Sequence, residues 1–485
     1  MILGVVMVPV YIRYMGAEAY GIIGFYTVLQ VWFSLLDIGF TPTMARETAR
    51  YRGGVNSALN LRRQLRAFEV IFSCVAIFGG IAMILLSGII AGKWLKVESL
   101  QLDQVRNALI LVAIILTLRC VSSLYRSTIT GFERLIWLGG FNFTISTLRY
   151  LLVVPLFIIF PASIEVFFCY QLIVAIIELA ILITKTHLLM PRVENIIGLF
   201  GHWESLRGTV GFSLSVAFTS NVWILVTQTD KLILSNLLSL SDYAFFTLAV
   251  LAASGVTFIC VPINAALVPR LTKLAAQNDE TDIIHTYRGA TQLVCLIAVP
   301  TTLVLALFAH EIIFVWTGDA EIAKKAAPVL TLYALGNGFL SLGSFPYFLQ
   351  IAKGNLRFHI VGSSLYLVIL IPTIIWATLQ YGVVGAGTIW LIINALYFFI
   401  WPPIVHQRFF KGFHFAWLMR DIAPIVTFSS IIAVMMRSFI KWPNGRIYVL
   451  LCIVTAGIIL LIVSSASSSF ARERLTGRLL TRFAE

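Results

Sequence analysis

Long apolar runs, separated by short polar connections, recur from one end of the chain to the other. Most of them hold about 18 residues or more, which is enough for a helix to cross a hydrocarbon core about 30 Å thick. The alternation of apolar and polar residues that marks a transmembrane β-strand is absent. The pattern therefore predicts an all-α polytopic membrane protein with about fourteen transmembrane helices. The predicted spans are 2–12, 20–40, 67–91, 104–126, 135–160, 164–184, 208–236, 243–268, 288–315, 326–350, 357–379, 383–405, 420–440 and 446–466.

The first of these runs is short. It holds about eleven residues before Arg13, roughly half of the length that a crossing needs. We expect either that the start codon has been placed too late or that this helix is incomplete. The run lacks a basic segment before it and a small-residue cleavage site after it, so a removable signal peptide is not predicted.

The composition and the charge distribution agree with the membrane class. The chain is 59% hydrophobic and only 12% charged, which does not suit a water-soluble fold. The formal net charge of +13 comes from Lys and Arg in short connections, not from one basic patch, so nucleic acid is not an expected partner. Their excess in alternate connections predicts that both termini are cytoplasmic. One connection departs from this rule, because Arg437, Lys441 and Arg446 fall on the predicted outer side.

Signatures of enzymes and metal sites are missing from the sequence. The six cysteines fall in apolar segments without a CxxC or Cys/His cluster, so neither disulfides nor a metal site is expected. There is no Walker loop, GxSxG elbow or HExxH motif. The longest connections hold about twenty-five residues, too few for the large extramembrane loop of a membrane glycosyltransferase or polymerase. We therefore predict that the protein is not an enzyme and has no cofactor.

The chain repeats itself at an offset of 223 residues. Four pairs of identical residues carry the repeat: Tyr20 and Tyr243, Gly131 and Gly354, Arg134 and Arg357, and Gly139 and Gly362. An even number of predicted spans separates the partners, so the halves share one orientation, and parallel repeats of this kind hold the substrate between them. The predicted parts are an N-terminal six-helix lobe over 1–184, a cytoplasmic linker over 185–207, a C-terminal six-helix lobe over 208–405, and two additional helices with a basic cytoplasmic tail over 406–485.

Polar residues at helical spacing line one face of several predicted spans. Lipid cannot satisfy such faces, so they predict a shared, water-accessible chamber, although hydrogen bonds between helices would also explain the Ser, Thr and Asn positions. The faces are Gln30, Ser34, Asp37 and Thr41; Arg119, Ser123, Arg126 and Thr130; Asn142, Ser146 and Arg149; Ser213, Ser220, Thr227 and Lys231; and Asn337, Ser341 and Ser344.

The basic residues on these faces predict a cationic cavity for an anionic cargo, because guanidinium forks bind phosphate oxygens in paired geometry. Arg149 is the strongest substrate-binding candidate, since it lies close to the middle of a span, where a charge is costly. Its alternative role is an ion pair with Glu178 or Asp37. The predicted cavity residues are Arg149, Arg119, Arg126 and Lys231, of which Arg119 and Arg126 could instead anchor the cytoplasmic end of their helix.

A second set of charges is predicted to serve gating or ion coupling. Carboxylates within the membrane, such as Asp37 and Asp230, could take up a proton or a sodium ion, or could pair with Arg13, Arg46 or Lys231 as a gate. The candidates are Asp37, Asp230, Glu178, Arg13, Arg46 and Arg270.

Six short motifs follow one another along the first 405 residues: RYMGAEAYG at 13–21, LDIGF at 36–40, GFER at 131–134, TDKLIL at 229–234, PRL at 269–271 and AKG at 352–354. In order and spacing they resemble the polysaccharide transport branch of the multidrug/oligosaccharidyl-lipid/polysaccharide exporter superfamily, the O-antigen flippases. The resemblance implies a MATE-like fold with two six-helix lobes around a cationic cavity. It also implies alternating access that carries an undecaprenyl-diphosphate-linked oligosaccharide across the bacterial inner membrane, with the diphosphate held by arginines and lysines.

The predicted function is thus a flippase for a lipid-linked oligosaccharide such as an O-antigen unit. We expect a monomer that contacts membrane lipids and works beside a polysaccharide polymerase and chain-length machinery. A cation-coupled multidrug exporter of the same superfamily is one alternative, but it would rely on carboxylates and aromatic surfaces where basic residues predominate here. A membrane polysaccharide polymerase or ligase is another, and it would carry a large periplasmic loop.

Overall fold

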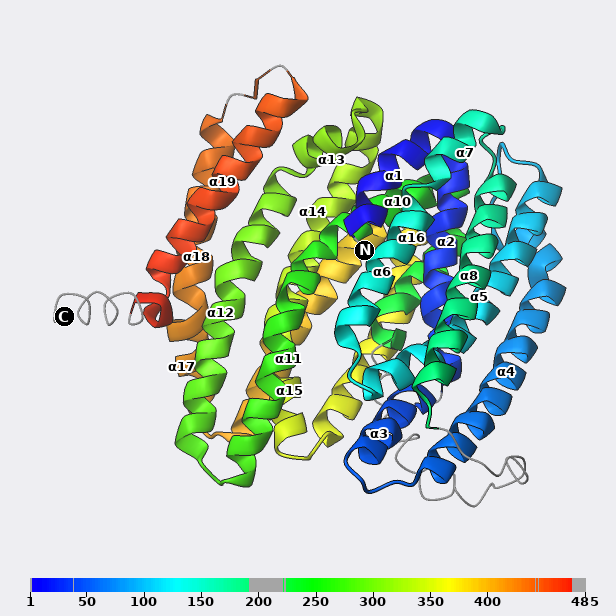
Figure 1. The fold of residues 1–485 in the computed structure, drawn as a ribbon. Coiled ribbons are helices and arrows are strands. Elements are labelled where there is room, and N and C mark those ends of the chain that lie inside the picture. Colours follow the sequence, from blue (N-terminus) through cyan, green and yellow to red (C-terminus); the bar gives the residue numbers. More distant parts are fainter. Residues whose placement is uncertain are drawn as a thin grey trace, which may run out of the picture. The chain divides into compact units, whose positions relative to one another are not determined.

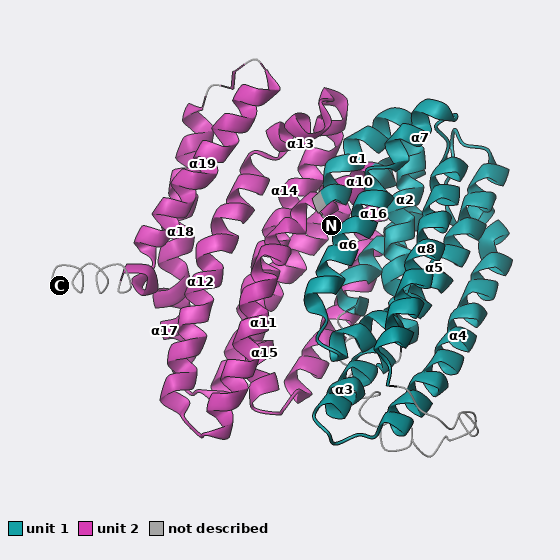
Figure 2. Ribbon diagram, viewed as in Figure 1, with its two compact units in different colours: residues 1–244 teal, residues 245–485 magenta. Residues whose placement is uncertain are grey.

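The computed structural model describes residues 2–37, 39–191, 221, 224–440, 442–443 and 445–472 (Figure 1). Nearly all of this part of the chain is helical, and the extended pairing found in it is an isolated parallel bridge between Lys96 and Ser239. The helices divide into two compact units, residues 1–244 and 245–485, which Figure 2 colours separately.

In unit 1, helix α5 is central and packs against α3, α4 and α8. The unit also contains a helix over 224–237 and the start of α10 (Leu240–Ala253). Its other elements are α1 (Ile2–Met15), α2 (Ala17–Phe33), the 3-10 turn η1 (Ser34–Asp37), α3 (Phe40–Arg52), α4 (Ala58–Ile89), the π-helical turn η2 (Ile90–Trp94), α5 (Leu102–Gly131), α6 (Leu135–Tyr150), α7 (Val153–Ile159) and α8 (Ile164–Leu189).

In unit 2, helix α12 packs against α11, α14 and the two C-terminal helices. The elements are α11 (Gly255–Ala276), α12 (Glu280–Leu307), α13 (Ala309–Thr317), α14 (Ala320–Gly343), α15 (Phe345–Ala352), α16 (Arg357–Phe409), α17 (Phe413–Ala416), the π-helical turn η3 (Trp417–Ile422), α18 (Ala423–Phe439) and α19 (Arg446–Ser467).

Helix α16 folds back on itself at Gly382. In a straight helix, Tyr366 and Tyr397 would lie about 46 Å apart, yet their ring centroids are 5.7 Å apart. Trp401 likewise packs directly on Gly362. The φ of Gly382 is +59°, a conformation that glycine adopts at little cost. The element therefore consists of two antiparallel helices, as the predicted spans 357–379 and 383–405 require.

Eleven helices in the described residues are long and apolar enough to cross a membrane, with α16 counted once. The predicted class, an all-helical protein with many spans, is thus confirmed. Helix α1 has 14 residues and a length of about 21 Å. Most of the predicted span 208–236, including Ser213 and Ser220, lies outside the described residues, as does most of the predicted linker.

Several predicted spans are built from two helices instead of one. The spans 135–160, 243–268, 288–315 and 326–350 form the pairs α6 and α7, α10 and α11, α12 and α13, and α14 and α15. Pro155 and Pro346 follow two of these breaks. Proline lacks the backbone N–H of a helix interior and its ring crowds the preceding turn, so a break is expected there. The basic stretch after residue 40, predicted as a connection, forms the separate helix α3.

The boundary between the compact units differs from the predicted lobes. The C-terminal lobe was predicted to begin at 208, whereas the described residues up to Ala244 belong to unit 1. Contacts made by the end of η2 and by the residues that follow it explain the difference. Trp94 Nε1 donates to Ser235 Oγ at 2.9 Å, and Lys96 Nζ donates to the Leu237 carbonyl at 2.7 Å. The division into functional lobes stays a prediction.

The exception to the charge rule has a local explanation in unit 2. Arg437 Nη1 lies 2.5 Å from Glu311 Oε1, and Arg446 Nη2 donates to the Val315 carbonyl at 2.6 Å. That carbonyl belongs to the last turn of α13, where the helix dipole is negative. Two of the three basic residues therefore have anionic or dipolar partners, while Lys441 lies outside the described residues.

Candidate functional site

Arg149 lies in the last turn of α6, directly before the break that separates this helix from α7. The break leaves backbone carbonyls without partners in the helix. Side chains from α1 and α8 bind them: Tyr11 Oη donates to the Tyr150 carbonyl at 2.7 Å, Tyr170 Oη to the Leu148 carbonyl at 2.6 Å, and Gln171 Nε2 to the Arg149 carbonyl at 3.0 Å. The backbone that carries Arg149 is therefore fixed within the membrane span.

Glu178 of α8 is the counter-ion for two arginines. Arg149 Nη2 donates to Glu178 Oε2, and Arg126 Nη2 of α5 donates to Glu178 Oε1. The residue Glu178 is only 4% exposed. Arg126 also donates to Asn142 Oδ1 and lies over the ring of Phe141, so it bridges α5, α6 and α8. The alternative of an ion pair between Arg149 and Glu178, open from the sequence, is present in the structure.

Arg119 is the third arginine of this cluster and lies about two turns before Arg126 on α5. Its Nη1 donates to Gln30 Oε1 of α2 at 2.6 Å, and its guanidinium lies 5.3 Å from the ring centroid of Tyr26. It is also within electrostatic range of Arg149 and Glu178. The structure thus brings three of the four predicted cavity residues together in unit 1, while their role in substrate binding stays a prediction.

The arginine cluster, defined as Arg119, Arg126 and Arg149 around Glu178, is incompletely satisfied. Two guanidinium groups share one carboxylate and Arg119 binds an amide oxygen, so positive charge is left over among the described residues. Within the part of the chain that the structure describes, three buried donors, Nε and Nη2 of Arg119 and Nε of Arg149, have no hydrogen-bond partner. Buried donors without partners are rare in folded proteins and call for a ligand, water or ion. Their neighbours Gln30 and Asn142 are exposed amides that lipid cannot satisfy.

The fourth predicted cavity residue, Lys231, lies in the helix over 224–237. Its Nζ donates to the Thr227 carbonyl, and lies 3.4 Å from Oδ1 of the fully buried Asp230. The predicted pairing of these two neighbours is therefore present. The convergence of Lys231 with the arginines stays a prediction.

Asp37 caps a helix where a gating ion pair was predicted. Its Oδ1 accepts the backbone N–H of Thr41 at 2.8 Å, at the start of α3. Among the described residues it forms no ion pair with Arg13 or Arg46. The reason is local, because η1 and Gly39, with φ +76°, turn the chain so that Asp37 faces the first N–H groups of α3. Arg13, Arg46 and Arg270 are exposed.

A group of contacts on the predicted outer side was missed by the sequence interpretation. Glu18 Oε2 accepts the backbone N–H of Ser99 at 2.8 Å and that of Leu100 at 3.1 Å. Next to it, the Leu240 N–H donates to the Lys96 carbonyl at 3.0 Å. Trp94 belongs to the same group through its hydrogen bond to Ser235. From the sequence, Glu18 could be singled out by its place in the first motif and Trp94 by its place before a loop. The residues that they contact could not be identified.

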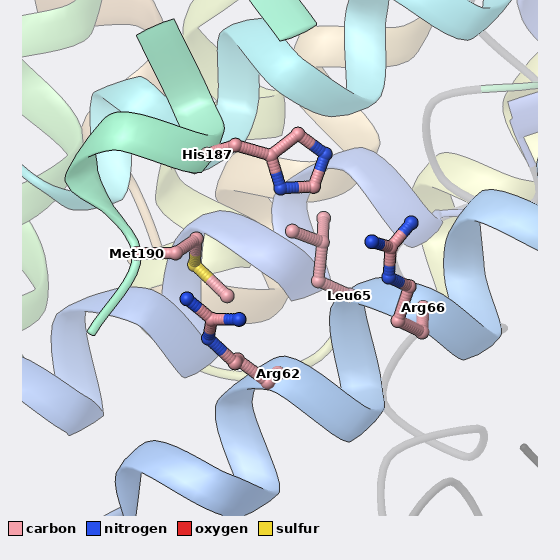
Figure 3. Close-up of a pocket in the computed structure, with 5 residues that line it drawn as sticks. All are labelled: Arg62, Leu65, Arg66, His187 and Met190. Atoms are coloured by element: carbon pink, nitrogen blue, oxygen red, sulfur yellow. The ribbon is translucent and has the colours of Figure 1, made fainter. Parts of the chain in front are cut away.

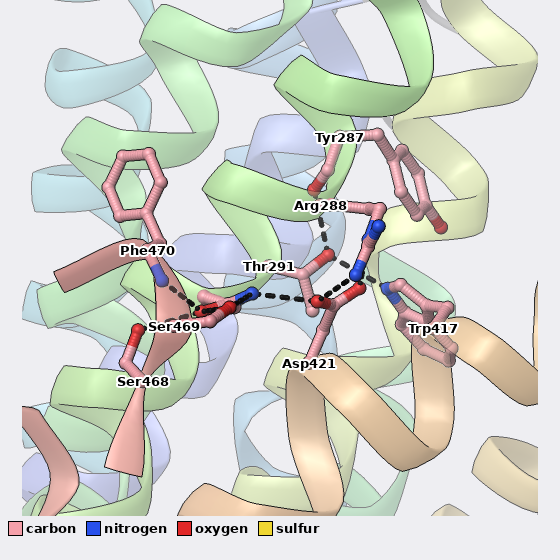
Figure 4. Close-up of polar contacts among 9 residues, drawn as sticks. Tyr287, Arg288, Thr291, Trp417, Asp421, Ser468, Ser469 and Phe470 are labelled. Atoms are coloured by element: carbon pink, nitrogen blue, oxygen red, sulfur yellow. Dashed lines mark hydrogen bonds and ion pairs between the residues drawn. The ribbon is translucent and has the colours of Figure 1, made fainter. Parts of the chain in front are cut away.

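A second buried charged network ties the C-terminal helices to α12 in unit 2 (Figure 4). Arg288 Nε and Nη2 donate to the two oxygens of Asp421 at 2.7 and 3.0 Å, and Gln292 Nε2 donates to the same carboxylate at 2.7 Å. Gln292 Oε1 in turn accepts from Ser468 Oγ at 2.7 Å and from the N–H of Phe470 at 2.9 Å. Asp421 itself is 0% exposed.

Comparison with known proteins agrees with these features. Residues 1–275, more than half of the chain, match the profile of the polysaccharide biosynthesis protein family. The chain belongs to this family. It is also 20% identical over 390 residues to a Shigella flexneri protein named "Putative O-antigen transporter", with 78% of this chain and 88% of that protein covered.

The fold resembles two solved transporter structures. A structure of the lipid II flippase MurJ in an inward closed conformation has a TM-score of 0.72 at 14% identity, over 98% of this chain and 97% of that chain. An inward-facing multidrug resistance MATE family transporter of the MOP superfamily has a TM-score of 0.66 at 11% identity, over 84% and 96%. At these identities the likeness shows the fold alone. The predicted family and MATE-like fold are confirmed.

Proposed function

We propose that the protein is a flippase that moves an undecaprenyl-diphosphate-linked oligosaccharide, the lipid-linked precursor of an O-antigen or related surface polysaccharide, from the cytoplasmic to the periplasmic leaflet of a bacterial inner membrane. Family membership and the similarity to an O-antigen transporter support this cargo class. The observation that carries the proposal is the arginine cluster, with its surplus positive charge and its three buried donors that lack partners among the described residues.

Arginine forks bind phosphate oxygens through two parallel charge-assisted hydrogen bonds. In the proposed bound state the free donors of Arg119 and Arg149 hold the diphosphate. Glu178 orients Arg126 and Arg149. Gln30 orients Arg119. The polar sugar requires a hydrated path, for which the exposed Gln30 and Asn142 provide hydrogen-bonding groups. The free donors of Arg119 and Arg149 are buried in the present conformation, so the helices must move before the cargo reaches them.

In the proposed architecture, fourteen spans form two six-helix lobes related by the 223-residue repeat, followed by two C-terminal helices, with both termini cytoplasmic. Local structure supports the repeat. Tyr20 and Tyr243 are both buried in the first turn of a helix, where their N–H groups donate to the carbonyls of Gly16 and Ser239. Lys231 would then extend the cationic surface from the second lobe.

Alternating access requires contacts that open and close on each side of the membrane. The contacts of Trp94 and Lys96 with residues 235–240 join the first predicted lobe to the start of the second predicted lobe. We assign them to the gate on the outer side of the membrane. The charged candidates Arg13, Arg46, Arg270, Asp37 and Asp230 would adjust this movement or couple it to a proton or a sodium ion. The protein would act as a transporter and not as an enzyme, next to the polymerase and chain-length machinery.

The outer contacts can be tested with a cross-link. The residues of a β-bridge lie about 5 Å apart between Cα atoms, within the range that a disulfide spans. In a background without the six free cysteines, oxidised Lys96→Cys/Ser239→Cys protein should stop transporting and recover after reduction. Each single cysteine variant is the control. Undiminished transport by fully cross-linked protein would remove these contacts from the gate.

The cargo assignment is tested by depletion of the protein in its host, followed by analysis of where lipid-linked oligosaccharide accumulates. Build-up in the cytoplasmic leaflet supports flipping. Build-up in the periplasmic leaflet would instead point to a polymerase or ligase. Normal polysaccharide with altered resistance to cationic drugs would favour the multidrug exporter.

A further inference from the structure

A half-open pocket in unit 1 lies where the first turns of α4 meet the last turn of α8 (Figure 3). It is lined by Arg62, Leu65, Arg66, His187 and Met190. The two arginines are four residues apart, so they lie on one face of α4. The pocket shares no residue with the arginine cluster around Glu178.

The pocket has a surplus of hydrogen-bond donors. Arg62 Nε donates to the Pro191 carbonyl at 2.5 Å, and within the described part of the chain its terminal amino groups donate to no other residue. Arg66 Nη1 donates to Glu69 Oε2 at 2.9 Å but its side chain is 47% exposed, so it can turn towards a ligand. His187 Nε2 lies 3.4 Å from Glu69 Oε1. Glu69 thus contacts both Arg66 and His187. Arg62 donates instead to a backbone carbonyl.

Two of the five residues that line the pocket are apolar. Leu65 and Met190 are 2% and 5% exposed and belong to one core cluster of unit 1. Figure 3 shows their side chains between the guanidinium groups and the His187 ring. A free inorganic anion gains nothing from these two side chains, whereas a phosphate diester with a glycerol and acyl chains would bury methylene groups against them.

The position of the pocket fits the headgroup level of the membrane. Helix α4 begins at Ala58, four residues before Arg62, and α8 ends at Leu189. The excess of basic residues in the connections at these ends predicts that they are cytoplasmic. Basic pockets between helices at this level bind the headgroups of anionic lipids, which the cytoplasmic leaflet contains.

We propose that this pocket binds the phosphate diester of an anionic phospholipid from the cytoplasmic leaflet. Arg62 and Arg66 hold the phosphate oxygens, while Leu65 and Met190 contact the glycerol and the first methylenes of the acyl chains. The site is separate from the proposed cargo site and does not depend on it.

The test measures lipid binding by the purified full chain in detergent, by native mass spectrometry and by titration with phosphatidylglycerol or phosphatidylcholine. The wild-type protein should prefer phosphatidylglycerol. Arg62→Gln/Arg66→Gln should weaken phosphatidylglycerol binding about tenfold, since each basic side chain near the surface contributes to anionic lipid attraction. The control Arg408→Gln/Lys411→Gln removes the same charge from exposed positions on another cytoplasmic connection and should bind as wild type.

Arg66→Glu serves as a second variant, because this half-exposed residue can be changed without disturbing the core, and its monodisperse elution in gel filtration reports that it folds. It too should bind phosphatidylglycerol more weakly. The proposal is overturned by wild-type affinity in both pocket variants, or by an equal loss in the control. Inorganic phosphate that competes as strongly as phosphatidylglycerol would assign the pocket to free anions instead.

Discussion

Two buried charged networks of this protein differ in how completely they are satisfied. In unit 2, one arginine, one carboxylate and one glutamine join α12, η3 and the end of α19, and both oxygens of Asp421 accept hydrogen bonds. In unit 1, two arginines share one carboxylate and a third binds an amide, and three buried guanidinium donors have no partner among the described residues. The first network neutralises itself, while the second retains positive charge.

Charge within a membrane protein is costly, so a surplus requires a reason. A closed network such as Arg288 with Asp421 fixes helices against each other and needs no ligand. The arginine cluster is held just as firmly, since Tyr11, Tyr170 and Gln171 bind the carbonyls around Arg149. Rigid support combined with unused donors is what a preorganised anion site requires. The difference suggests that unit 2 uses its charges for structure and unit 1 uses them for binding.

The largest effect is expected for Arg149→Ala. It should reduce transport about 100-fold or more, because an arginine fork contributes two charge-assisted hydrogen bonds to phosphate, each about 1.5–3 kcal/mol. Surface polysaccharide is the readout in cells, with membrane insertion checked by blotting. Arg106→Ala, an exposed arginine on α5, is the control. Normal polysaccharide in the Arg149 variant would remove this residue from the site.

The second effect is on stability. Asp421→Ala leaves Arg288 without its carboxylate and should destabilise unit 2 by about 3–5 kcal/mol, as breaking a buried ion pair does. Thermal unfolding in detergent measures the change, and Asp282→Ala, an exposed carboxylate on the same α12, should have little effect. Transport per folded molecule should remain close to wild type. A specific loss of transport in fully folded Asp421→Ala protein would assign the network in unit 2 to function.

Sequence alone distinguished these regions only in part. Arg149 was identifiable because a charge near mid-span is costly, and the following Pro155 marks the helix break that positions it. Arg119 and Arg126 share a face of α5 by their spacing, which predicted their convergence. Asp421 lies 133 residues from Arg288, and no periodicity connects residues on different helices. From the sequence, Asp37 and Glu178 had the same predicted role in gating or ion coupling. In the structure Asp37 caps α3, whereas Glu178 binds two arginines.

A smaller effect on transport should follow when the arginine cluster is given an additional carboxylate, as in the neutralised network of unit 2. Gln30→Glu gives Arg119 a carboxylate partner in place of the amide oxygen 2.6 Å away. The new charge competes with phosphate, so transport should fall about tenfold, which corresponds to about 1.4 kcal/mol. Gln30→Ala, which removes the hydrogen bond without adding charge, should cost less than Gln30→Glu. If the alanine variant transports no better than the glutamate variant, the loss comes from packing and not from charge.

The smallest effect is expected when both partners of the satisfied pair are replaced together. Exchanging a buried ion pair for apolar residues of similar volume is often neutral or stabilising, because neither charge then has to leave water. Arg288→Met/Asp421→Leu should therefore unfold within about 2 kcal/mol of wild type and retain transport. The corresponding change in unit 1, Arg126→Met/Arg149→Met/Glu178→Leu, removes both arginines that Glu178 binds, so it should also fold but should not transport. Comparable transport by these two sets of variants, measured per folded molecule, would show that the arginine cluster has no part in moving the cargo.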